Sequence, residues 1–324
     1  MPITEVISND QDLTLTIIAD YAVPVERLWD AYSDPRQLEK FWGPVEWPAT
    51  FTRHDMAVGG ESHYFMTGPD GTKAGGWFRF LAVEPLRLIE VQDGFTDEHG
   101  AKNTDMPTMH MRFTFESTPT GSRFRSVSTF TSIESMQQLV QMGMMEGMRS
   151  AMSQIDTVLA DLASFAASRG TESQMLSDTE VRISRVVRGT VAQVWRAHHE
   201  PALMQRWMLG PDGWTMPVCE VATVVGDRYR YEWASVDGTQ RFGFEGELLE
   251  SAPPYRAVTT ERIIGTEGPA THNVLSLVPL TDGTLLTATI TYPSKELRDM
   301  ILGTGMVNGM ETSYARLERE VLAA

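Results

Sequence analysis

The sequence repeats itself once. A segment that begins at Val25 and reads Val-Glu-Arg-Leu-Trp-Asp-Ala returns 166 residues later, from Val191, as Val-Ala-Gln-Val-Trp-Arg-Ala. An acidic residue and a proline follow each copy, and these prolines are Pro35 and Pro201. Internal similarity at a fixed separation is the signature of a duplicated structural unit. The chain is therefore predicted to fold as two related domains.

The match extends to the far end of each half, where the separation is 162 residues. Gly143 and Gly147 each precede a methionine, and so do Gly305 and Gly309. A change of a few residues between the two ends of the match is what insertions and deletions in loops produce. This ordered series of matches indicates that whole domains, and not a single motif, are duplicated.

The chain length agrees with two domains, because 324 residues are about twice the commonest domain size. Residues 166–175 are mostly small and polar, which is typical of a linker. We therefore expect one domain over residues 1–168 and a second over residues 175–324. Because one chain holds both domains at high effective concentration, we also expect them to dock as an internal pseudo-dimer.

Both halves show the same order of predicted elements. Apolar and polar residues alternate over residues 13–21, which is typical of a strand. Two short helices are predicted next, one from Val25 and one over residues 35–41. A run of antiparallel strands follows, in which Met111 and Phe113 alternate with polar residues. Turn signals separate these strands at Gly59-Gly60, Pro69-Asp70-Gly71, Gly75-Gly76, Asp93-Gly94 and Pro119-Thr120-Gly121.

Each half ends in a predicted long helix, over residues 135–163 and 294–323. Glycines repeated within these helices predict a kink or a close approach by a loop, because glycine disfavours a helix by about 1 kcal/mol. The helix is the element able to cover the sheet, so each half is predicted to be an α+β domain. A curved antiparallel sheet would then wrap around the helix and leave a cavity between them. The apolar face of the first helix is formed by Met144, Met148, Met152, Ile155 and Leu159.

Composition excludes several classes of partner. The formal net charge of -16 argues against nucleic acid and against anionic membranes. Cys219 is the single cysteine, so no disulfide forms within the chain, and its neighbours favour a core residue over a nucleophile. No basic and apolar leader and no long apolar run are present in the sequence, so we expect a cytoplasmic protein.

The order of these motifs resembles the START-like superfamily, whose members have the helix-grip (Bet v 1-like) fold. More specifically, it resembles the SRPBCC proteins related to the activator of heat-shock-protein-90 ATPase. The resemblance is carried by Val25-Glu26-Arg27-Leu28-Trp29-Asp30-Ala31, Trp42-Gly43-Pro44 and Val83-Glu84-Pro85-Leu86-Arg87-Leu88. It implies two tandem helix-grip domains, each with a hydrophobic ligand cavity between sheet and helix. It implies no fixed activity, because relatives serve as carriers, co-chaperone domains, resistance proteins or polyketide cyclases.

The favoured function is therefore binding of a small apolar or aromatic molecule, without catalysis and without a cofactor. The many methionines suit such a cavity because their side chains adapt to irregular apolar shapes, although plain core packing would also use them. The first domain is the better candidate, because its inner wall carries hydroxyl groups. The residues expected to contact ligand are Trp42, Tyr64, Trp77, Phe113, Ser126, Ser128, Met144 and Met148 in the first domain and Trp207, Tyr231, Tyr292, Met306 and Met310 in the second.

Ser126 and Ser128 differ from the other predicted ligand residues because their hydroxyls fall in the middle of a predicted inward face. A buried hydroxyl without a partner costs about 1–3 kcal/mol. A wet or ligand-filled cavity would remove that cost, and so would a hydrogen bond to nearby backbone. The matching residues of the second half, such as Ala288, are apolar.

Two other functions remain open at this stage. An enzyme of cyclase or hydrolase type would use a cavity residue such as His110 or Glu90 as acid or base, although these two equally suit the outer face. A chaperone-like interaction with a protein partner, stimulating a heat-shock-protein ATPase, is suggested by the resemblance alone. The histidines lack the spacing of metal ligands, so no metal is predicted.

Overall fold

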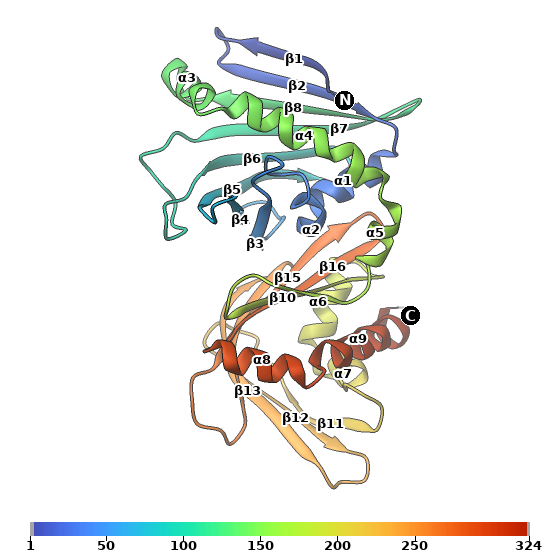
Figure 1. Cartoon of the computed structure of the whole chain (residues 1–324). Coiled ribbons are helices and arrows are strands. Elements are labelled where there is room, and N and C mark those ends of the chain that lie inside the picture. Colours follow the sequence, from blue (N-terminus) through green and yellow to red (C-terminus); the bar gives the residue numbers. More distant parts are fainter. Residues whose placement is uncertain (1–2, 323–324) are drawn as a thin grey trace. The chain divides into compact units, whose positions relative to one another are not determined.

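The computed structural model describes residues 3–322, which divide into two compact units, one ending at Ala163 and the other beginning at Ser164. Each unit is an α+β domain in which helices accompany an eight-stranded antiparallel sheet (Figure 1). The division lies a few residues before the expected linker, residues 166–175. Part of that segment is built into the second domain, because the Thr171 hydroxyl donates a hydrogen bond of 2.5 Å to Glu311.

Domain one follows the predicted order of strand, two short helices, a run of strands and terminal helices. Its sheet has the strand order β1-β2-β8-β7-β6-β5-β4-β3, and every pairing is antiparallel. Figure 1 shows α4 lying across this sheet. The elements are β1 (Ile3–Asn9), β2 (Thr14–Tyr21), α1 (Val25–Ser33), α2 (Pro35–Leu38), β3 (Ala49–His54), β4 (Glu61–Thr67), β5 (Lys73–Glu84), β6 (Leu88–Phe95), β7 (Met109–Thr118), β8 (Gly121–Phe130), α3 (Ile133–Gln141), α4 (Met144–Ala160) and α5 (Leu162–Ala167).

Domain two repeats this architecture. Its sheet has the strand order β11-β12-β13-β14-β15-β16-β10-β9, so β9 is the edge strand that corresponds to β1. Neither edge strand was predicted from the sequence. The elements are β9 (Glu172–Met175), β10 (Glu180–Val187), α6 (Val191–His199), α7 (Pro201–Trp207), β11 (Trp214–Glu220), β12 (Arg228–Ser235), β13 (Arg241–Ala252), β14 (Arg256–Ile263), β15 (Thr271–Leu280), β16 (Gly283–Thr291), α8 (Lys295–Gly303), α9 (Met306–Leu317) and a final turn of π-helix, η1 (Glu318–Leu322).

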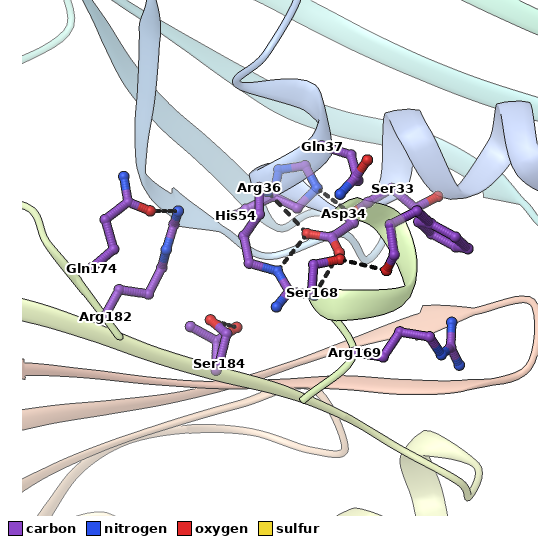
Figure 2. Close-up of polar contacts among 12 residues, drawn as sticks. Ser33, Asp34, Arg36, Gln37, His54, Ser168, Arg169, Gln174, Arg182 and Ser184 are labelled. Atoms are coloured by element: carbon purple, nitrogen blue, oxygen red, sulfur yellow. Dashed lines mark hydrogen bonds and ion pairs between the residues drawn. The ribbon is translucent and has the colours of Figure 1, made fainter. Parts of the chain in front are cut away.

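The junction of the two short helices of domain one is fixed by Asp34. Its carboxylate accepts a hydrogen bond of 2.9 Å from the backbone N–H of Arg36, which caps the N-terminus of α2. The same carboxylate forms a buried ion pair with the Arg36 guanidinium at 2.7 Å (Figure 2). Pro35 occupies the first position of α2, where a missing N–H has no cost. The Asp-Pro pair therefore ends α1 and starts α2, as predicted.

Within domain two, Arg182 holds the new edge strand in place. This buried residue of β10 donates a hydrogen bond from its guanidinium to the side-chain oxygen of Gln174 in β9 (Figure 2). Backbone pairing of β9 with β10 places the two residues opposite each other. The strand is short, and a side-chain bond of this kind compensates for its few backbone pairs.

The terminal helix is not continuous, which corrects the prediction of one helix over residues 135–163. Gly143 has a left-handed backbone conformation, with φ of 87°, and it separates α3 from α4. Gly305 has φ of 83° and separates α8 from α9 in the same way. Periodicity alone cannot reveal such a break, because the apolar residues resume on the same face after it. The kink that the repeated glycines predicted is thus present in both domains.

We expect Gly143→Ala to lower the stability of domain one by about 1–2 kcal/mol, because a Cβ is unfavourable in the left-handed region. The matched control is Gly147→Ala, one turn later in α4. A Cβ there would meet only the Pro44 ring at 3.8 Å, so this change should raise stability by up to about 1 kcal/mol. Amide hydrogen exchange of the full chain, read on peptides of each domain, checks both values. Equal effects of the two changes would contradict the prediction.

Two of the predicted turns are wrong. Gly75-Gly76 lies inside β5 and Asp93-Gly94 lies inside β6. These glycines serve close packing, because a Cβ on Gly76 would sit 2.4 Å from the Tyr64 ring and one on Gly94 would sit 2.8 Å from the indole of Trp77. A glycine required by a neighbouring ring and a glycine required by a turn look the same in a sequence.

Candidate ligand cavity

Domain one contains a cavity of about 310 Å³ between its sheet and its terminal helices. The wall is almost entirely aromatic, methionine and aliphatic. It is built by α1, the segment after α2, strands β4, β6, β7 and β8, and helices α3 and α4. Met142, at the break between α3 and α4, is 55% exposed and marks the end of the cavity that faces solvent. Among the helices of residues 3–322, none is long and apolar enough to cross a membrane.

The helical side of the cavity is supplied by α4. Met144, Met148 and Met152 line it, and Gly147 lies between them and leaves open space where a side chain would stand. Unbranched methionine side chains change shape at little cost. This wall can therefore adjust to occupants of different outline.

The sheet side is a cluster of aromatic rings. Trp42 packs edge-on against Tyr64 and Phe113, with ring centroids 6.0 and 6.4 Å apart. Phe124 stacks on Tyr32 at 4.7 Å. Burial raises the pKa of the Tyr64 phenol well above its usual range, and the nearby Asp93 carboxyl adds to this shift. These aromatic side chains of the wall are thus large, rigid and uncharged.

The segment between α2 and β3 is fastened to α4. Gln154 donates a hydrogen bond of 2.9 Å to the carbonyl of Gly43, and the hydroxyl of Ser150 accepts one of 3.2 Å from the backbone N–H of Val45. The Gly43 Cα is itself pressed against Trp47, since a Cβ would lie 2.0 Å from the Trp47 carbonyl oxygen. Trp42 is therefore held at the cavity by backbone contacts close to it in the chain.

Among the described residues that line the cavity, Asp93 alone has an acidic or basic side chain. It is 6% exposed, and no residue in the described part of the chain donates a hydrogen bond to its carboxyl group. Loss of water around the carboxylate raises its pKa from 3.8 to about 8. A carboxyl group of this kind holds a proton at neutral pH and gives it up when a cation or a strong donor arrives.

Ser126 also lines the cavity, and Ser128 lies two residues along β8. Both side chains are buried, and within residues 3–322 neither hydroxyl has a hydrogen-bond partner. Ser126 pairs across the sheet with Ile17 and Phe113, so its surroundings are otherwise apolar. The backbone bond that would have satisfied these hydroxyls is therefore not made in the described structure.

Six of the eight ligand residues predicted for domain one meet at this cavity. Trp77 does not reach it, because it points to the other face of β5, where its indole N–H donates to the Phe95 carbonyl and Lys102 covers its ring at 4.0 Å. Ser128 is buried beyond the cavity wall. The six that line the cavity are Trp42, Tyr64, Phe113, Ser126, Met144 and Met148.

His110 and Glu90 lie on the opposite face of the sheet. Their side chains are 2.9 Å apart, and they alternate along β7 and β6 with the cavity residues Met111 and Asp93. The pair therefore has no access to the cavity from that face. This geometry gives no support to the enzyme hypothesis that used these two residues.

Domain two has a smaller cavity, of about 230 Å³, at the corresponding place. Of the five residues expected to contact ligand in domain two, Trp207, Met306 and Met310 line this cavity, whereas Tyr231 and Tyr292 do not. Tyr231 instead packs between Tyr229 and Trp233. The Tyr292 hydroxyl contacts the sulfur of Met306 at 3.8 Å, and burial raises its pKa to about 12.

The carboxyl group at the matching position of domain two is Glu261. Thr260 pairs with His272 as Gln92 pairs with His110, so Glu261 and Asp93 follow equivalent residues. Here, however, the Tyr229 hydroxyl lies 3.2 Å from the carboxylate and shares its one proton between Glu261 and the Thr260 carbonyl, which is 2.8 Å away. The carboxyl group therefore has a partner in domain two, and none among the described residues of domain one.

Other chemistry-bearing side chains are dispersed. Among residues 3–322, no three His, Cys, Asp or Glu side chains gather in a way that would hold a metal ion. Cys219 is half-buried on β11, 3.9 Å from the sulfur of Met204, and burial raises its pKa to about 11. A thiol with a raised pKa is a poor nucleophile.

Comparison with models of known protein families shows which family this chain belongs to. The model of the family described as "Activator of Hsp90 ATPase homolog 1-like protein" matches residues 22–160 and again residues 188–321. The chain belongs to this family. Two copies of the domain stand in tandem, as the internal repeat predicted.

Solved structures similar to this chain are about one domain long. A solution structure of a protein from Arthrobacter aurescens is 45% identical, covering 49% of this chain and 92% of its own, with a TM-score of 0.47. A crystal structure of a protein from Mycobacterium smegmatis is 46% identical, covering 49% of this chain and 98% of its own, with the same TM-score. A crystal structure of a protein from Rhodobacter sphaeroides is 28% identical, covering 48% of this chain and 99% of its own, with a TM-score of 0.45. No curated protein matches the chain.

The sequence did not lead us to Asp93, because the pair Asp93-Gly94 was interpreted as a turn. A signal was nevertheless present. Ile89 and Val91 alternate with polar residues, and continuing that alternation places Asp93 and Phe95 on the same inward face. An aspartate that falls at an inward-facing position of an otherwise apolar strand face was the sequence signal for this site.

Proposed function

We propose that domain one is a binding protein for a small, largely aromatic molecule, held in the cavity between its sheet and α4 without catalysis. The observation that carries this proposal is the 310 Å³ cavity, whose wall is aromatic and methionine-rich. Ligand pockets of proteins typically begin at about this size and have mainly apolar walls. Ser126, which is buried without a partner among the described residues, favours a cavity that is filled in use.

Domain two is proposed to serve a different role. Its cavity is smaller. The segment between α7 and β11, which lines that cavity, is held to α9 by a charged side chain, because Arg316 donates a hydrogen bond of 3.1 Å to the Gly210 carbonyl and forms an ion pair of 2.9 Å with Asp212. The corresponding bond in domain one comes from the neutral Gln154. We expect domain two to bind the same probes more weakly.

The test uses N-phenyl-1-naphthylamine, a neutral dye whose fluorescence rises in apolar surroundings. Gly147→Trp places an indole in the open space of the domain-one cavity and should reduce dye binding at least tenfold. Gly309→Trp is the matched control, because Gly309 lines the domain-two cavity and a Cβ there meets nothing within 4 Å. This change should leave most of the binding intact.

Two results would overturn the proposal. One is the absence of saturable dye binding to the wild-type chain. The other is dye binding that survives Gly147→Trp and is lost in Gly309→Trp, which would assign the ligand to domain two. Hydrogen exchange of each variant confirms that both domains remain folded while the dye is measured.

A further inference from the structure

The cavity of domain one joins two features that together point to one class of ligand. One is a set of aromatic faces, contributed by Trp42, Tyr64 and Phe113. The other is a single carboxyl group, Asp93, which is buried and lacks a hydrogen-bond donor among residues 3–322. Aromatic faces attract organic cations through their ring quadrupoles, and a carboxylate attracts them by charge.

From this geometry we infer that the ligand carries a protonated amine on an aromatic body, and that Asp93 forms its ion pair. The inference rests on the proposed function, because it names the class of molecule that the same cavity takes. Asp93 reaches the cavity from β6, and Ser126 from β8 supplies an additional hydrogen-bond acceptor in the same wall.

The charges around Asp93 support a cation over an anion. Tyr64 faces it from β4 and Tyr32 contributes from α1, and both are neutral phenols whose pKa values are raised by burial. The lining residues of β7, β8, α3, α4 and the segment after α2 carry no charge. No lysine, arginine or histidine among the described wall residues can neutralise Asp93 or attract an anionic ligand. The net charge of -16 further concentrates cations near the chain.

Domain two supplies an internal comparison. The matching Glu261 has the Tyr229 hydroxyl within hydrogen-bond distance, shared with the Thr260 carbonyl, so its carboxyl group has a nearby donor that Asp93 lacks. Glu261 lies on β14, the strand that corresponds to β6, but unlike Asp93 it does not line the cavity of its own domain. The carboxyl group at this position therefore has a donor and lies outside the cavity in domain two, whereas in domain one it has no donor among the described residues and lines the cavity. Amine recognition is accordingly assigned to domain one alone.

Binding of the amine requires Asp93 to release its proton. Burial raises the pKa of Asp93 to about 8 in the empty cavity, so one proton leaves for each cation that enters at pH 7. The affinity for an ammonium ligand should then rise about tenfold per pH unit between pH 6 and pH 8. It should level off above pH 8, where Asp93 is already ionised and an aliphatic ammonium, with a pKa of about 10, still carries its charge.

The experiment uses four indoles of similar outline, each measured by displacement of N-phenyl-1-naphthylamine. Tryptamine is a cation, tryptophol a neutral alcohol, 3-ethylindole apolar and indole-3-propionate an anion. At pH 8 we expect tryptamine to bind at least tenfold more tightly than tryptophol, and indole-3-propionate most weakly. Asp93→Asn should remove the preference for tryptamine, and Asp93→Leu should make 3-ethylindole the best ligand. Glu261→Gln should leave the order unchanged.

The outcomes separate this inference from the proposed function. If the dye binds but tryptamine and tryptophol compete equally, or if Asp93→Asn keeps the preference, amine recognition by Asp93 is wrong and the apolar cavity stands. Amine recognition is equally wrong if no indole displaces a bound dye. If the dye itself does not bind, the proposed function fails first. A preference for tryptamine that shows no rise between pH 6 and pH 8 also overturns the role given to Asp93.

Discussion

Asp93→Asn is expected to stabilise domain one strongly above pH 8, much less at pH 5 and hardly at all below pH 4. Burial raises the pKa of Asp93 from 3.8 to about 8, so the folded domain keeps a proton that the unfolded chain releases above about pH 4. The wild-type domain therefore loses about 1.4 kcal/mol of stability per pH unit across this window. The accumulated loss is on the order of 5 kcal/mol once the pH exceeds 8.

The measurement is the free energy of opening of β6, β7 and β8, obtained by amide hydrogen exchange of the full chain at pH 5, 7 and 9. The difference between variant and wild type should grow with pH, because asparagine has the shape of aspartate and never ionises. Asp105→Asn, at an exposed position outside the cavity, is the control and should follow the wild type. A difference that is constant with pH would show that Asp93 is ionised throughout and that the cavity is wet.

Trp29→Ala is expected to destabilise domain one by about 3–5 kcal/mol, the usual cost of removing a fully buried tryptophan. Trp29 is 1% exposed, and its ring meets Phe115 edge-on at 5.2 Å. Its partner in the repeat is Trp195, which is only half-buried and stacks on His199 at 3.8 Å. Because less of the Trp195 surface leaves water on folding, Trp195→Ala should cost domain two about half as much.

Amide hydrogen exchange, read on peptides of each domain, measures the loss of stability of domain one and of domain two separately in the same molecule. Each substitution should affect its own domain, which makes the unchanged domain an internal reference. Equal losses from the two substitutions would mean that the repeat preserves the energetic role of the tryptophan together with its position. The structure predicts that the position is preserved and that the role is not.

Much of the fold could be predicted from the sequence because the chain presents it twice. Matching Val25 with Val191 revealed the duplication, and the alternation around Phe113 revealed an inward strand face that the structure confirms. The edge strands β1 and β9 were missed because an exposed edge strand has no strong apolar alternation. The break at Gly143 was anticipated only as a kink, since helical periodicity continues on both sides of it.

The candidate site was predictable in part, for a physical reason. Trp42, Tyr64 and Met148 are large apolar residues of the kind that line the interior of a domain. Their inward-pointing side chains could therefore be inferred from the sequence. Trp77 looked equivalent in sequence, but one residue of register places it on the other face of β5. Asp93 was hidden by its glycine neighbour, whose role is to admit the Trp77 ring and not to form a turn.

The unequal carboxyl groups Asp93 and Glu261 have a consequence for how this protein can change over generations. In a protein that pairs two identical chains, a substitution alters both binding sites at once, and a change that harms one harms the other. When both domains are encoded in a single gene, each site is inherited separately. Domain one can then gain or lose a ligand at Asp93 while Glu261, with its Tyr229 partner, maintains a working fold in the other half.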